Sequence, residues 1–440
     1  MIALKDVIFV KACIYTLGCK VNAYESEYVR SILEDNGYEV VNFGDKSDIV
    51  IINTCSVTNN SDSKSRKMIN QAIKNYPNAC IVAMGCFIEA NHDIEIDGVD
   101  ILLGNKDKSK LVELLYKYFE KKEQIRNFYT YEKLGEVFEN MEISTFKGKT
   151  RAFVKIQDGC ENFCTYCIIP YVRGKCRSKD KNEVLKEIKT LVENGYKEVV
   201  LTGIHTGNYG VDLNTNFASL LEEIIEIPNL YRIRISSIEI TELNDKVLDI
   251  LKNSKIIADH LHIPLQAGSD HVLKLMNRKY DLDYFREKIK EIRSIREEIS
   301  ISTDVIVGFP GETKEDFQST LDFSKEIGFS KIHVFPYSPR KNTPAASFKN
   351  QIDGIEKKRR AHELIELSKT LEEDYMKKNI GKTLECLIEE SDEEYSYGHT
   401  SNYLHVKIKG KYESEEIKDV EIEDINYPYV LASAKQKHEI

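Results

Sequence analysis

The first third of the chain alternates short apolar runs with longer amphipathic stretches. Four runs have the length and composition of buried strands, and they occupy residues 11–17, 47–54, 78–84 and 98–104. Between them, helix-like stretches repeat apolar positions at the spacing of one helix face, as at residues 23–38 and 61–76. This alternation predicts an α/β domain with a mainly parallel sheet. We assign it residues 1–120, and we expect residues 121–147, which lack a clean period, to form a linker.

The middle of the chain repeats one strand-and-helix unit six times. The strand-like runs occupy residues 152–157, 198–204, 231–239, 260–266, 299–308 and 331–338. Six units are too few to close an eightfold barrel, so residues 148–377 are predicted to form an open, partial (β/α)6 barrel. Residues 378–440 change to short alternating runs, which predict a small β-barrel of the kind that binds nucleic acids.

Composition and charge narrow the class of protein. The chain has 440 residues, of which 41% are hydrophobic and 30% charged, as in globular proteins. It shows no apolar run of transmembrane length and no signal-peptide pattern, so we expect a cytoplasmic protein without a membrane partner. In that compartment the ten cysteines stay reduced. The net charge of −10 argues against a generally cationic nucleic-acid binder but is compatible with a local basic face.

Three cysteines lie close together directly after the first barrel strand. Cys160, Cys164 and Cys167 are in the loop where a barrel keeps its active site. A structural zinc site uses four ligands, whereas three thiolates can hold three irons of a [4Fe–4S] cluster and leave the fourth iron open. A zinc site and scattered core cysteines are the alternatives. Tyr166, directly before Cys167, is either a packing residue or a wall beside a bound ligand.

A second set of cysteines follows strands of the N-terminal domain. Cys19, Cys55 and Cys86 each come directly after a predicted strand. The carboxyl ends of parallel strands border the ligand crevice of an open sheet, so the three can converge on a second cluster. Coincidence is the alternative explanation. Cys13 and Cys80 lie inside strand runs, where a cysteine is a small buried hydrophobe.

The spacing C-x3-C-x2-C resembles the signature of the radical S-adenosylmethionine (SAM) superfamily. That resemblance implies that SAM chelates the open iron and is cleaved to a 5′-deoxyadenosyl radical. The phrases TLGCKVNAYESE, NTCSVTNNSDSKSR and MGCFIEA resemble the N-terminal domain of the methylthiotransferases, and the resemblance covers nearly the whole chain. It implies two [4Fe–4S] clusters, one on each cysteine set, and a catalytic role for the set in the barrel.

Two phrases resemble one branch of that family. TLGCKVNAYES and GHTSNYLHV are similar to the branch that methylthiolates carbon 2 of threonylcarbamoyladenosine at tRNA position 37, beside the anticodon. The implied partners are tRNA, SAM and a reducing electron donor such as flavodoxin or ferredoxin. One SAM would donate its methyl group to sulfur at the N-terminal cluster, and a second would be cleaved in the barrel. The alternatives are isopentenyladenosine in tRNA, a ribosomal protein, or a non-catalytic iron–sulfur protein that binds RNA.

Other barrel segments supply candidate cosubstrate contacts. They are Tyr166, Gly203, Ser236, Glu239, Gln266 and Asp304. The alternative for each is an ordinary core or turn residue. We do not expect His205, His262 and Asp304 to be metal ligands, because no partner lies at ligand spacing in the sequence.

A basic segment flanks the barrel cysteines. Residues 147–181 hold nine Lys or Arg residues against three acids, so Arg173, Lys175 and Arg177 are candidate phosphate contacts. The C-terminal module resembles a TRAM-type RNA-binding barrel but is rich in acids. We therefore expect stacking by Tyr397, His399 and Tyr403 to contribute more than charge. Cys176 stands where the family more often has a charged residue, and we interpret it as incidental.

Overall fold

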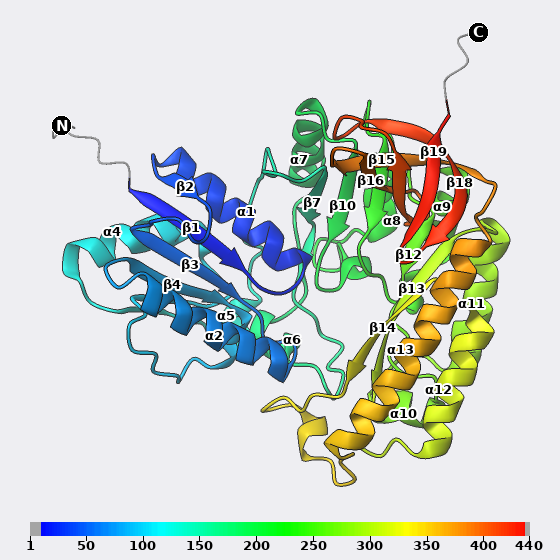
Figure 1. The fold of residues 1–440 in the computed structure, drawn as a ribbon. Helices are drawn as coiled ribbons and strands as arrows, with labels where there is room; N and C mark the ends of the chain where they lie inside the picture. The colour runs from blue at the N-terminus through cyan, green and yellow to red at the C-terminus, as the bar shows by residue number, and fades with distance from the viewer. Residues whose placement is uncertain (1–9, 436–440) are drawn as a thin grey trace.

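The computed structural model describes residues 10–435 and divides into three parts (Figure 1). Residues 1–9, which entered the signal-peptide expectation, lie outside that range. Figure 1 shows an N-terminal α/β domain in blue and cyan, a partial barrel in green and yellow, and a small red barrel. None of the helices in residues 10–435 has both the length and the apolar character that crossing a membrane requires.

The N-terminal domain contains one parallel sheet in the order β2-β1-β3-β4-β5-β6. Its strands are β1 (Lys11–Thr16), β2 (Glu39–Val41), β3 (Ile49–Thr54), β4 (Cys80–Gly85), β5 (Ile101–Leu103) and β6 (Ile125–Asn127). The connecting helices are α1 (Lys20–Asp35), α2 (Asn59–Asn75), α3 (Cys86–Ala90) and α4 (Leu111–Lys121). Every residue of β3 and β4 is buried, because helices cover both faces, and this explains their continuous apolar runs.

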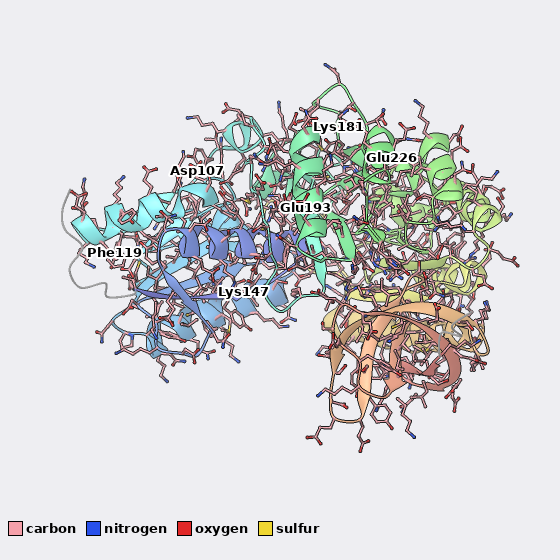
Figure 2. The ribbon with its side chains drawn as sticks, turned by 90° about the horizontal axis from the view of Figure 1, so that it is seen from above. Asp107, Phe119, Lys147, Lys181, Glu193 and Glu226 are labelled. Atoms are coloured by element: carbon pink, nitrogen blue, oxygen red, sulfur yellow. The ribbon has the colours of Figure 1, made fainter. Side chains whose placement is uncertain are left out.

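The predicted linker is wrong in one respect, because residues 121–147 are part of the packed structure. Strand β6 adds a sixth strand to the sheet, and α5 (Tyr131–Leu134) is a single turn. Met141, Ile143 and Phe146 are buried in the core of the partial barrel. Elements this short cannot show a period in sequence. Figure 2 shows Lys147 at the junction of the two domains.

Six parallel strands form the partial barrel, which confirms the predicted fold class. They are β7 (Arg151–Lys155), β10 (Glu198–Thr202), β11 (Arg232–Ile235), β12 (His260–His262), β13 (Ser300–Val307) and β14 (Lys331–Pro336). They form two three-stranded sheets that meet at a bridge between Ile233 and Ile257. The helices that follow them are α7 (Lys181–Glu193), α8 (Phe217–Ile224), α9 (Asp245–Asn253), α10 (Asp270–Leu275), α11 (Leu282–Ile295), α12 (Lys314–Ile327) and α13 (Gly354–Lys377).

The C-terminal module is a closed five-stranded barrel, also as predicted. Its strands are β15 (Thr383–Ser391), β16 (Tyr395–Thr400), β17 (His405–Lys409), β18 (Ile417–Asn426) and β19 (Tyr429–Ala434). It contacts the partial barrel where the strands of that barrel begin. Arg234 on β11 donates to the carbonyl of Thr400 at 3.3 Å, and the Asp259 amide donates to Ser401 Oγ at 3.0 Å.

Candidate active site

The loop that carries the three barrel cysteines is closed at its base by a short hairpin. Strand β8 (Gln157–Asp158) pairs antiparallel with β9 (Arg177–Ser178), and the loop runs between them. Gly159 has a φ of +76°, and a Cβ there would lie 1.9 Å from the Lys175 carbonyl oxygen. Glycine is therefore required for this close approach.

The three thiols of this loop are close enough to influence one another's pKa. The Cys167 amide donates to the Cys164 carbonyl at 2.9 Å, and the Cys160 amide donates to the Gly174 carbonyl at 3.1 Å. Burial, followed by the neighbouring Cys164 and Cys160, raises the pKa of Cys167 to about 12. Three mutually close thiols become thiolates only when a cation compensates them, and three thiolates suit a [4Fe–4S] cluster with one open iron.

A cavity of about 180 Å³ opens beside these cysteines, and Cys164, His205, Glu239, Arg278 and Tyr280 are among its lining residues. Arg278 Nη1 lies 3.3 Å from Cys164 Sγ, and the same guanidinium pairs with Glu239. His205 lies 3.8 Å from Cys160 Sγ through Nδ1 and 2.5 Å from Glu242 through Nε2. A cation and a carboxylate beside this cysteine set are suited to bind the two charged ends of an amino acid.

The second set of cysteines lies at one edge of the N-terminal sheet. Cys19 caps α1, Cys55 follows β3, and Cys86 begins α3 directly after β4. The parent strands β1, β3 and β4 are adjacent in the sheet. Burial, followed by Cys86 and then Cys19, raises the pKa of Cys55. A Cβ at Gly18 would lie 3.2 Å from Cys55 Sγ.

Comparison with known proteins shows how these two sites belong together. Residues 11–104 match the family described as "Uncharacterized protein family UPF0004", and residues 154–324 match the "Radical SAM superfamily". The chain is 43% identical over 425 residues to the threonylcarbamoyladenosine tRNA methylthiotransferase MtaB of Bacillus subtilis, and the match covers 94% of each chain. It is 39% identical over 407 residues to the protein of the same name from Aquifex aeolicus, covering 91% of this chain and 97% of that one.

The chain belongs to the radical SAM methylthiotransferase family. The cofactors expected from its cysteines, SAM and [4Fe–4S] clusters, are those of this family. Among solved structures, it resembles the radical SAM methyltransferase TsrM of Kitasatospora setae with a TM-score of 0.57 and 14% identity, covering 76% of this chain and 77% of that one. At that identity the likeness shows the fold alone.

The six predicted cosubstrate contacts of this methylthiotransferase stay predictions, and the structure gives each a different setting. Glu239 lines the cavity beside the barrel cysteines. Tyr166 packs on Phe309, with ring centroids 6.4 Å apart, and burial together with Cys164 and Cys167 raises its pKa. Ser236 is buried, with its hydroxyl 3.5 Å from that of Thr206.

The remaining three predicted contacts are Gly203, Gln266 and Asp304. A Cβ at Gly203 would lie 3.2 Å from Gln157, so this glycine permits close packing. Gln266 has a φ of +66°, and its backbone N–H donates to the backbone carbonyl of Asp304 at 2.8 Å. Asp304 lies 3.3 Å from His262. Arg278 was missed from sequence, because a single arginine in the phrase MNRK shows no spacing that points to a site.

Two of the three expected phosphate contacts in this segment are wrong, because their side chains are buried. Arg173 is 0% exposed and Arg177 is 4% exposed, and both guanidinium groups pair with Asp158. Neither side chain can reach an RNA phosphate. Lys175 is exposed and remains a candidate.

Arg173 instead belongs to a charged network buried between the two domains. Glu25 on α1 pairs with Lys108, Lys155 and Arg173 at 3.5, 2.9 and 2.8 Å. Asp158 pairs with Lys155 at 2.7 Å and also with Arg173 and Arg177. Burial raises the pKa of Glu25, but Arg173, Lys108 and Lys155 outweigh it and hold the pKa well below its usual range.

This network has an excess of positive charge, since four cations face two carboxylates. It lies next to the N-terminal cysteines: Arg173 Nη2 donates at 3.1 Å to Asn22 Oδ1, which lies 3.7 Å from Cys19 Sγ. Asn105 Nδ2 lies 3.5 Å from Cys86 Sγ. Buried cations are stable only beside compensating negative charge, and an anionic thiolate-bound cluster supplies it. The charge around the N-terminal cysteines therefore suits an anionic iron–sulfur cluster, and this agrees with the three thiol ligands.

Proposed function

We propose that this chain is a tRNA methylthiotransferase that adds a methylthio group to carbon 2 of threonylcarbamoyladenosine at tRNA position 37. The observation that carries the proposal is the pair of three-cysteine sites, one at the sheet edge of the N-terminal domain and one in the barrel loop. The relatives from Bacillus subtilis and Aquifex aeolicus, named for this substrate, support the choice of nucleoside.

Each domain has a separate task in this proposal. In residues 1–120, Cys19, Cys55 and Cys86 would hold one cluster, which would supply a docking point for sulfur. In residues 148–377, Cys160, Cys164 and Cys167 would hold the other, which would supply a site for SAM and the electron for its cleavage. Residues 378–440 bind RNA. The electron comes from a small reducing donor of the flavodoxin or ferredoxin class, and the enzyme acts in the cytoplasm with its tRNA.

Side chains that line the cavity beside the barrel cysteines orient the cosubstrate. Arg278 is placed to bind the carboxylate of the methionine part of SAM, and Glu239 to accept a hydrogen bond from its amino group. Tyr166 closes one side of the loop against Phe309. In the N-terminal site, the Arg173 guanidinium lies near Cys19 and Cys86, where it would compensate the negative charge of thiolates. Carbon 2 of adenine is too inert for acid–base chemistry, which is why a radical is needed.

The nucleoside test decides between substrates. Deletion of the gene is expected to remove 2-methylthio-threonylcarbamoyladenosine from total tRNA, as measured by mass spectrometry of digested nucleosides. The internal controls are the ribosomal proteins and the methylthiolated isopentenyladenosine of tRNA from the same cells, since each should keep its methylthio group. Loss of either control modification, with the threonylcarbamoyl product unchanged, would exclude the proposed substrate.

A row of aromatic rings offers a stacking surface for the RNA. Neighbouring ring centroids along it lie 5.5, 4.2, 4.6 and 4.9 Å apart, and the row consists of Tyr397, Tyr429, His405, His399 and Tyr403. Its inner end, Tyr403, stacks on His260 of β12 at 4.6 Å. The outer rings are therefore the ones free to stack on bases, whereas Tyr403 joins the two barrels.

Replacing Tyr397 and Tyr429 together by alanine is expected to weaken tRNA binding. One stacked base contributes about 1–3 kcal/mol, so the dissociation constant should rise about fivefold to 150-fold. SAM cleavage should be unchanged, because the cavity beside the barrel cysteines is formed by other residues. The matched control is Tyr116→Ala, a 60% exposed tyrosine on α4. Equal tRNA affinity in the double variant and the control would disprove the stacking role.

A further inference from the structure

Three metal-ligating side chains meet on the partial barrel, outside both cysteine sites. His262 on β12, Asp304 on β13 and His333 on β14 come from three adjacent parallel strands. Their ligand atoms all lie within 4.8 Å of one another. His262 Nε2 is 3.3 Å from Asp304 Oδ2, and Asp304 is directly opposite His333 in the strand register.

The expectation that His262 and Asp304 are not metal ligands rested on sequence spacing alone, and the structure places a third potential ligand beside them. This third residue is His333 on β14, and helix α12 separates it from Asp304 in the sequence. Parallel strands require such a crossover, so neighbours in a parallel sheet are always distant in sequence. Only the sheet order β12-β13-β14 brings the three together.

A hydrogen bond holds the first histidine in an orientation suited to a metal. Ser302 Oγ lies 2.9 Å from His262 Nδ1 and also 2.9 Å from His260 Nε2. When Nδ1 of His262 donates to Ser302, the serine hydroxyl can donate to His260, and Nε2 of His262 presents its lone pair toward Asp304. This outer hydrogen bond is the usual support of a metal-bound histidine.

We propose that His262, Asp304 and His333 form a binding site for a divalent transition-metal ion of the zinc or iron(II) class. Two imidazoles and one carboxylate are a common ligand set for such ions, with the remaining positions open to water or another oxygen ligand. The ion would replace the contact between His262 and Asp304 and neutralise the carboxylate.

The distances and exposure allow an ion to enter and bind. Ligands at about 2.0–2.2 Å from a zinc ion are separated by at most about 4 Å, so the His262–Asp304 pair already fits. His333 is within 4.8 Å of both, and its exposed side chain can change rotamer to complete the site. The side chains of His262 and Asp304 are 15% and 30% exposed, so the site has an entry path. The proposal does not depend on which substrate the enzyme modifies.

Zinc binding to the reconstituted enzyme tests the site directly. Holoenzyme with both clusters is dialysed against zinc at low micromolar concentration, and zinc and iron are measured by mass spectrometry. We expect about one zinc per chain in the unaltered protein. His333→Ala and Asp304→Asn should each lower zinc occupancy at least tenfold with unchanged iron. The matched control His362→Ala, an exposed histidine on α13, should bind zinc as the unaltered protein does.

X-ray absorption at the zinc edge separates this site from the cysteines. The proposed site requires nitrogen and oxygen ligands only. Sulfur ligands would show that zinc had entered a cysteine site, and the proposal would be wrong. It would be equally wrong if the unaltered protein bound no zinc, or if both variants bound as much as the control.

Discussion

Replacing Cys160, Cys164 and Cys167 together by alanine is expected to abolish the formation of 5′-deoxyadenosine. Among residues 10–435, Cys164 is the one cysteine that lines the cavity with Glu239 and Arg278, and Cys160 and Cys167 belong to the same loop. Without them no open iron is available to bind and cleave SAM. Iron should fall from about eight to about four atoms per chain, because the N-terminal ligands are untouched. The measurements are iron content after anaerobic reconstitution and nucleoside yield with a strong reductant.

The matched control is Cys176→Ser, in the same loop. Cys176 Sγ lies 3.7 Å from the Gly159 carbonyl and 3.9 Å from Asn208 Nδ2, so the thiol has ordinary polar neighbours. A serine hydroxyl can make the same contacts. This variant should keep about eight irons and SAM cleavage. Loss of one cluster in Cys176→Ser, or full iron in the triple alanine variant, would show that the ligands of the barrel loop have been misassigned.

Both cysteine sets could be predicted from sequence, because each cysteine lies at a position that the local pattern makes distinctive. The loop set lies within eight residues, so its members cannot be far apart. The N-terminal set is spread over a longer segment, but each cysteine directly follows a strand. In a parallel sheet with helical crossovers all those strand ends point the same way. The fold class followed from the same regular alternation of strands and helices.

The charged residues could not be placed from sequence. The basic segment 147–181 looked like a phosphate-binding surface, since counting charges does not say which side chains point inward. Lys155 and Arg173 point inward because Glu25 of the other domain compensates them, and Glu25 precedes these residues by 130 and 148 positions. Predicting that contact requires knowing how α1 docks on the barrel.

Tyr403 illustrates the same limit for an aromatic residue. The sequence predicts that Tyr403 stacks on RNA, but the structure places its ring against the other barrel. There it stacks on His260, and the Arg234 guanidinium lies 4.5 Å from its ring centroid. Partners from β11 and β12 determine its environment, and no local pattern reveals them.

The complementary experiment removes the N-terminal cluster and leaves the barrel cluster intact. Replacing Cys19, Cys55 and Cys86 together by alanine is expected to eliminate methylthiolated tRNA while SAM cleavage continues. The three thiols lie at the edge of a separate sheet, and none of them lines the cavity beside the barrel cysteines. About four irons per chain should remain. The measurements are iron content, 5′-deoxyadenosine yield and product nucleosides with tRNA that carries threonylcarbamoyladenosine.

The buried network determines how this result must be controlled. Removing the N-terminal cluster leaves the four cations around Glu25 and Asp158 without their anionic neighbour, so domain docking can weaken. Continued 5′-deoxyadenosine formation shows that the barrel is still folded, and unchanged tRNA affinity shows that the RNA surface is intact. With both retained, loss of product can be attributed to the missing sulfur site. Methylthiolated tRNA from the triple variant would instead show that sulfur reaches adenine without these cysteines, and the proposed division of labour would be wrong.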